Sequence, residues 1–143
     1  MNKVMLKIDA KQESGQGEED MMELVTDGKS YFKDDSVYLV YEESELSGME
    51  GCVTTLIIKD RAVTLKRYGA ASHELRFEPG GKFTGLYETP MGFIDMEILT
   101  NKVENSLNEN ATEGTISIEY EISLRGLMEA RNKLNIEILN VVQ

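Results

Sequence analysis

Apolar and polar residues alternate along much of this chain, and the clearest example runs from Thr115 to Leu124. Every second residue there is Ile, Tyr or Leu, and Thr, Ser or Glu occupies the positions between. A period of two places alternate side chains on opposite faces of a strand, whereas a helix needs apolar residues every three or four positions. The recurrence of this pattern predicts roughly eight to eleven short antiparallel strands and no helix longer than one or two turns.

Turn signals separate these segments. Between Val63 and Ile98 they occur at Gly69–Ser72, Pro79–Gly81 and Thr89–Gly92, where Pro fixes φ and Gly permits a positive φ. This stretch therefore reads as a β-meander of four strands. The dipeptide Asp27-Gly28 predicts another hairpin, which would interrupt the strand pattern between Met21 and Lys33. The segment from Arg125 to Asn132 is open to two interpretations, a hairpin turn or a single helical turn.

Successive hairpins with one apolar face favour a closed barrel over a sandwich of two sheets. The sequence contains no internal repeat and no linker that would divide it. We therefore expect an all-β protein, an antiparallel up-and-down barrel of about eight to ten strands, formed by one domain over residues 1–143.

Charge and composition narrow the classes of partner. The formal charge is −11 at pH 7, which argues against nucleic acid and anionic membranes because both are bound mainly through Lys and Arg. The single Cys52 cannot form an internal disulfide, and residues 1–7 lack the apolar core of a signal peptide. These features predict a cytoplasmic protein without nucleic-acid or membrane partners, present as a monomer or a homodimer.

The predicted turns allow the strand registers to be proposed. A two-residue turn at Asp60-Arg61 places Thr54 opposite Arg67, and the turn near Ala70 places Arg67 opposite His73. A turn centred on Gly80 then places His73 opposite Tyr87. The four side chains Thr54, Arg67, His73 and Tyr87 would form a polar row across an otherwise apolar inward face.

This polar row is the candidate ligand-binding site, and it has an ordinary structural alternative. An Arg and a His on an inward face need an acceptor, a role that a bound ligand in the mouth of a barrel could fill. Alternatively, Arg67 and His73 lie at the barrel rim and reach water. Because two neighbouring positive groups repel, we expect His73 to be neutral at pH 7 and to accept a hydrogen bond from Arg67 or Tyr87.

Other sites are less well supported by the residues. Four glutamates between Glu42 and Glu50 could hold a hard cation, but they match no EF-hand spacing and a solvated loop explains them better. A single His with one Cys does not make a zinc site. Ser44, Ser47 and Ser72 lack the context of a catalytic nucleophile. We therefore predict no catalytic residue, no metal site and no cofactor.

Four stretches together resemble a known family. They are 41–51 (YEESELSGMEG), 54–56 (TTL), 63–69 (VTLKRYG) and 85–92 (GLYETPMG). In this order they resemble the bacterial YwiB-like proteins of unknown function, a group of calycin or lipocalin-like barrels. The resemblance implies a calycin-like barrel over nearly the whole chain. It implies no activity, substrate or catalytic residue.

Three classes of function follow from these observations. The first is a barrel that binds a small anionic or amphipathic ligand in its interior. The second is a packed barrel that serves as a structural or protein-partner-binding module, and an enzyme is the third. The interior distinguishes the first two, because a ligand needs a cavity of a few hundred Å3 and a packed barrel leaves none.

Overall fold

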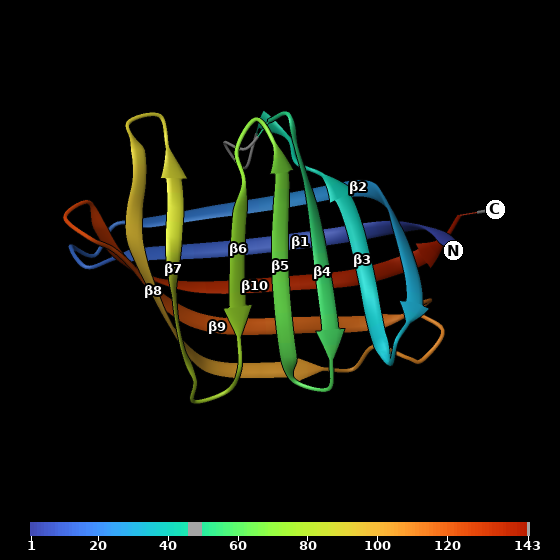
Figure 1. Ribbon diagram of the computed structural model, residues 1–143. Coiled ribbons are helices and arrows are strands. Elements are labelled where there is room, and N and C mark those ends of the chain that lie inside the picture. The colour runs from blue at the N-terminus through green and yellow to red at the C-terminus, as the bar shows by residue number, and fades with distance from the viewer. Residues whose placement is uncertain (46–49, 143) are drawn as a thin grey trace.

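The computed structural model describes residues 1–45 and 50–142, which form ten β-strands (Figure 1). Their bounds are β1 (Asn2–Ser14), β2 (Glu19–Lys33), β3 (Ser36–Glu42), β4 (Cys52–Lys59), β5 (Ala62–Gly69), β6 (His73–Phe77), β7 (Lys82–Thr89), β8 (Gly92–Asn105), β9 (Gly114–Leu124) and β10 (Met128–Val141).

All ten strands belong to one antiparallel sheet in the order β6-β5-β4-β3-β2-β1-β10-β9-β8-β7. Strands that are consecutive in sequence pair with each other, except β6 and β7, and β1 pairs with β10, so the first and last strands lie side by side. Figure 1 shows β1, β2, β9 and β10 running across β3 to β7, while β8 curves from one set into the other. The predicted up-and-down barrel is therefore confirmed, and it is nearly closed.

The opening in the barrel lies between β6 and β7, which corrects one expected pairing. These two strands are the edges of the sheet and form no ladder with each other. Their connection bonds to β8 instead, since the Gly80 amide donates to the Thr100 carbonyl (2.9 Å) and the Thr100 amide donates to the Gly81 carbonyl (3.1 Å). The expected registers within β4–β5 and β5–β6 are correct. A two-residue turn at Pro90-Met91 also predicts that Tyr87 lies opposite Ile94, and β7 and β8 pair in this register.

The hairpin expected at Asp27-Gly28 is also wrong, because β2 runs without interruption from Glu19 to Lys33. Gly28 lies between β1 and β3 at a point where they approach closely. A Cβ at this position would lie 2.6 Å from Leu6 Cδ1 and 2.8 Å from the Val40 carbonyl oxygen. Glycine is needed here for lack of space. Near the other end of the chain, residues 125–127 form a turn and β10 begins at Met128.

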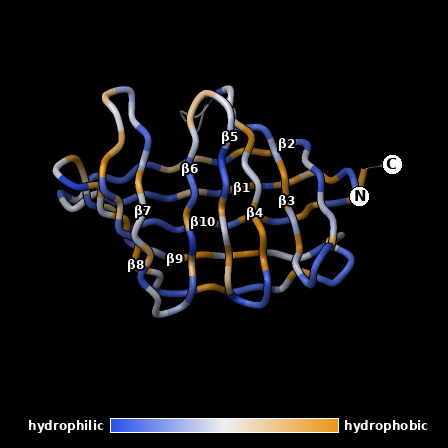
Figure 2. The backbone as a smooth tube through the Cα atoms, viewed as in Figure 1, coloured by the Kyte–Doolittle hydropathy of each residue, from blue (hydrophilic) through white to orange (hydrophobic). Residues whose placement is uncertain are grey.

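The core follows the alternation of the sequence, which Figure 2 shows as apolar and polar residues succeeding each other along the strands. The alternation predicts twelve core residues, of which eleven are buried and the twelfth, Phe83, is half-buried against the core. The strand phase slips near the C-terminus because a register shift lies between Met5 and Leu6, leaving Leu139 without a partner on β1. The buried residues are Leu6, Ile8, Leu39, Leu56, Leu65, Leu75, Phe77, Ile98, Ile118, Ile122 and Ile136.

Candidate functional site

The interior of the barrel is not completely filled. A cavity of about 540 Å3 lies between the crossing strands, and the exposed side chains of Asp20, Met21 and Met128 stand on its rim. Its apolar lining includes Ile8, Ala10, Leu65, Leu75, Ile122, Leu124 and Leu134. Its polar lining includes Tyr41, Glu43, Arg67, Tyr87, Tyr120 and Asn132. This part of the barrel therefore has space beside its side chains, as the ligand-binding interpretation requires.

The predicted polar row is present on the inward face. Thr54 is fully buried, and its hydroxyl accepts a hydrogen bond from Arg67 Nε at 3.3 Å. Arg67 Nη1 donates to His73 Nδ1 at 3.4 Å, and the His73 and Tyr87 rings stack with centroids 4.0 Å apart. Arg67 and Tyr87 line the cavity. Thr54 and His73 do not line it, and each accepts a hydrogen bond from Arg67. The contact between His73 and Tyr87 thus forms across the open seam without a backbone ladder.

Glu43 joins this row, although the sequence pattern placed it in a solvated acidic loop. Its side chain is 3% exposed, and its Oε1 accepts a hydrogen bond from the Thr54 hydroxyl at 2.8 Å. The same oxygen lies 3.9 Å from Arg67 Nη2, which makes an ion pair too long for a hydrogen bond. The alternation of Val37, Leu39 and Tyr41, continued by two residues, is the signal that would have placed Glu43 inward.

Tyr41 lines the cavity and lies beside the Glu43 carboxylate. The side chain is 5% exposed, and burial raises the pKa of its hydroxyl far above the ordinary value, with further upward contributions from the Glu43 charge and from hydrogen bonding to Glu43. Tyr41 is therefore a neutral donor beside Glu43 at every physiological pH.

The hydrogen bonds of His73 define its protonation state. Arg67 can only donate, so Nδ1 must accept, and the Glu88 carbonyl can only accept, so Nε2 must donate across 3.2 Å. Burial lowers the pKa of His73, and the Arg67 charge lowers it further against the opposing contribution of the Glu88 contacts. This is the neutral tautomer protonated on Nε2, as expected from the repulsion between two adjacent cations.

His73 is expected to titrate with a midpoint below 6.5, its ordinary pKa. Because folding lowers this pKa, its contribution to stability is full above pH 6.5 and is lost as the pH falls through the lower folded value. The chain contains one His, so the imidazole 15N signals give the midpoint without competing resonances. A midpoint at or above 6.5 would contradict the assigned contacts.

Three polar groups on the cavity wall retain free hydrogen-bonding capacity. Neither the Tyr87 nor the Tyr120 hydroxyl forms a hydrogen bond within residues 1–45 and 50–142. Burial raises the pKa of both, that of Tyr120 to about 12, so both hydroxyls carry their protons. Asn132 Nδ2 is buried without a partner among the described residues. The alternation over Thr115–Leu124 predicted that Tyr120 faces inward, whereas no sequence signal identified Asn132.

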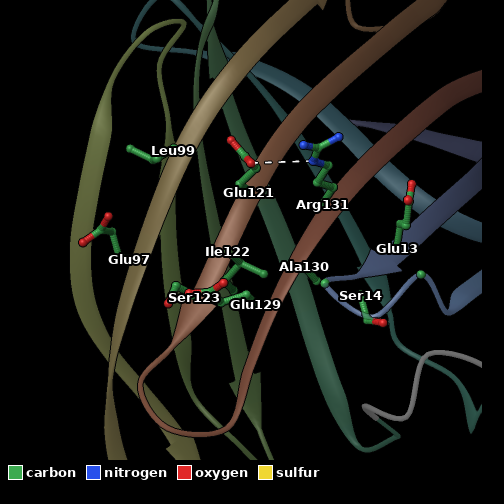
Figure 3. Close-up of a pocket in the computed structure, with 12 residues that line it drawn as sticks. Glu13, Ser14, Glu97, Leu99, Glu121, Ile122, Ser123, Glu129, Ala130 and Arg131 are labelled. Carbon is green, nitrogen blue, oxygen red and sulfur yellow. Dashed lines mark ion pairs between the residues drawn. The ribbon is translucent and has the colours of Figure 1, made fainter.

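A second hollow, of about 600 Å3, lies on outward-facing side chains of β1, β8, β9 and β10 (Figure 3). Its charged residues are Glu13, Glu97, Glu121, Glu129 and Arg131, and Arg131 Nε pairs with Glu121 Oε1 at 3.7 Å. No group of three His, Cys, Asp or Glu side chains in the described residues could hold a metal ion. We place the candidate site in the inner cavity, since only there are charged groups buried together with apolar walls.

The structure also places the acidic residues near Glu42 and the single cysteine, which the sequence singled out. Glu42 and Glu50 are exposed, and Glu43 is turned away from them toward Arg67. Ser47 lies outside the described residues. Cys52 is buried and forms no disulfide. In the described part of the chain, no helix has the length and apolar character needed to cross a membrane.

Comparisons with known proteins agree with this architecture. A family model described as a domain of unknown function, DUF1934, matches residues 6–136. The uncharacterized beta-barrel protein YwiB of Bacillus subtilis (strain 168) is 29% identical over 122 residues, which are 84% of this chain and 82% of that protein. The crystal structure of ywiB protein from Bacillus subtilis has a TM-score of 0.85 at 22% identity, covering 99% of this chain and 93% of that one. The barrel fold and the resemblance to YwiB are thereby confirmed, and the chain belongs to the DUF1934 family.

Proposed function

We propose that this barrel binds one small amphipathic molecule in its inner cavity. The observation that carries the proposal is a cavity whose lining combines apolar residues with polar groups that include Arg67, Tyr87, Tyr120 and Asn132. This is the calycin-like use of a barrel, in which the ligand lies inside. The ligand-binding role of Arg67 and Tyr87 is direct in this proposal, and that of Thr54 and His73 is to position Arg67.

The size and lining of the cavity suit a small molecule. A volume of about 540 Å3 lies in the usual range of ligand sites, which are apolar with a few convergent polar groups. Each buried methylene of a ligand adds about 0.8 kcal/mol, or about fourfold in affinity. Leu65, Leu75, Ile122 and Leu134 provide the surface against which such a chain would pack.

The polar groups determine how the ligand is oriented. Arg67 Nη2 makes no hydrogen bond within the described residues, and the Tyr87 and Tyr120 hydroxyls and Asn132 Nδ2 are also without acceptors there. All four can donate, so they match a head group that accepts hydrogen bonds through oxygen. A ligand oxygen in this position relieves the cost of leaving Asn132 Nδ2 buried and unpaired.

The proposal is tested with decanamide, whose carbonyl oxygen accepts hydrogen bonds and whose alkyl chain is apolar. We expect one molecule bound per chain by native mass spectrometry and calorimetry. Replacement of Leu134 by Trp should fill the cavity and weaken binding at least tenfold. Leu86, which is 58% exposed, provides the matched control, and Leu86→Trp should leave affinity unchanged.

Two results would contradict ligand binding in the cavity. One is failure of wild-type protein to bind decanamide and shorter or longer amides. The other is undiminished binding by a folded Leu134→Trp variant. Either would favour the alternative, a barrel that serves as a structural or protein-partner-binding module.

A further inference from the structure

The charges around the cavity cancel. Its charged lining residues are Lys11, Asp20, Glu43 and Arg67, two of each sign. Lys11 also pairs with Glu19 at 3.3 Å. Arg67 is the buried cation of the cavity lining in the part of the chain that the structure describes, and Glu43 lies beside it. His73 adds no charge, because both of its ring nitrogens are committed as in the neutral tautomer.

We propose that Glu43 determines the class of ligand, so that the cavity accepts an uncharged oxygen-bearing head group, such as an amide, ester or alcohol, and rejects carboxylates. The inference rests on the proposed function. It narrows the sequence-based expectation of an anionic or amphipathic ligand to neutral amphipathic molecules.

The geometry of the Glu43 and Arg67 side chains supports this selectivity. Thr54 joins them, because its hydroxyl donates to Glu43 at 2.8 Å and accepts from Arg67 at 3.3 Å. Thr54 therefore holds the Glu43 carboxylate beside the guanidinium. The Glu43–Arg67 ion pair as a whole carries no net charge, so a ligand carbonyl can accept from Arg67 without introducing charge.

A ligand carboxylate would meet the opposite situation. Its oxygens would lie about 2.9 Å from the Arg67 nitrogen that bonds them. Arg67 Nη2 is 3.9 Å from Glu43 Oε1, so the two carboxylates would share one buried cation at short range. Like charges at such a distance strongly disfavour having both groups ionised. Tyr41, Tyr87 and Tyr120 are neutral donors and supply no compensating positive charge.

The test compares decanamide with decanoate at pH 7.5, by calorimetry on the wild-type protein and on Glu43→Gln. Gln keeps an oxygen that accepts from Thr54 but removes the charge. Wild-type protein should bind decanamide at least tenfold more tightly than decanoate. Glu43→Gln should raise the affinity for decanoate relative to that for decanamide at least tenfold. Glu137→Gln, an exposed position on β10, removes the same charge and should change neither affinity.

The outcomes separate this inference from the function on which it rests. Equal wild-type affinities for the two ligands would overturn the inference alone, and this comparison needs no variant to fold. A folded Glu43→Gln protein that still rejects decanoate would also overturn it. Failure of the wild-type protein to bind either ligand would overturn the proposed function and the inference with it.

Discussion

Replacing Phe77 with Ala is expected to lower the free energy of unfolding by about 3–5 kcal/mol. Phe77 is fully buried on β6, pairs with Val63 on β5 and packs against Tyr120 with ring centroids 4.6 Å apart. Because β6 is an edge strand, its ladder on one side and its buried side chains hold it in place. Truncation removes the contact that joins this edge to β9 on the opposite side of the core.

Urea unfolding followed by far-ultraviolet circular dichroism gives this free energy. Phe93→Ala is the matched control, because the Phe93 side chain is 65% exposed and its loss should change stability by no more than about 0.5 kcal/mol. Similar effects of the two substitutions would show that Phe77 is not in the core.

Replacing Arg67 with Met is expected to destabilise the protein by about 3 kcal/mol. The substitution keeps most of the apolar stem but leaves the Glu43 carboxylate buried beside Thr54 without a cation. Removing one partner of a buried pair costs far more than removing both, since the remaining charge is uncompensated. Combining Arg67→Met with Glu43→Gln should therefore restore most of the lost stability.

A double-mutant cycle of these two substitutions measures the coupling. We expect an interaction energy of about 1–3 kcal/mol from urea unfolding of the four proteins. Lys66 is the control position, because its side chain is more than one-third exposed and its pair with Glu74 at 3.9 Å should contribute little. Additive effects of the Arg67 and Glu43 substitutions would mean that the carboxylate does not depend on the guanidinium.

Much of this fold could be predicted from local patterns. Alternation identifies which residues of a strand face inward, and a tight turn fixes the register of its two strands, so the Thr54, Arg67 and His73 pairings were accessible from the sequence. The lack of a ladder between β6 and β7 was not, because the amide and carbonyl groups of their connection bond to the distant residue Thr100. No local signal identifies such a partner.

The structure also differs from the sequence-based expectation at Gly28 and at Glu43, because the residues around each position are compatible with two different structures. A dipeptide such as Asp27-Gly28 looks the same whether Gly permits a turn or permits close approach of a neighbouring side chain, and here the neighbour is Leu6. The burial of Glu43 was not predicted, because this residue lies among other acidic residues, which are usually solvated. Its burial depends on Arg67, which lies 24 positions further along the chain and is brought close only by the strand pairing.

The cavity itself could not be predicted, because its volume depends on how side chains from crossing strands meet. Leu65 and Leu75 come from one set of strands and Ile122 and Leu134 from the other, and the space between them is set by the path of the whole barrel. Sequence patterns therefore predicted the polar row but not whether it faced open space.

The most direct measurement is the set of intermolecular nuclear Overhauser effects between decanamide and protein labelled at Ile and Leu methyl groups. Binding inside the barrel predicts contacts from the alkyl chain to Leu65, Ile122 and Leu134, with none to the exposed Leu86 and Leu127. Contacts to Leu86 or Leu127 alone, or the absence of any contact at saturating decanamide, would contradict the account of this barrel as a ligand-binding protein.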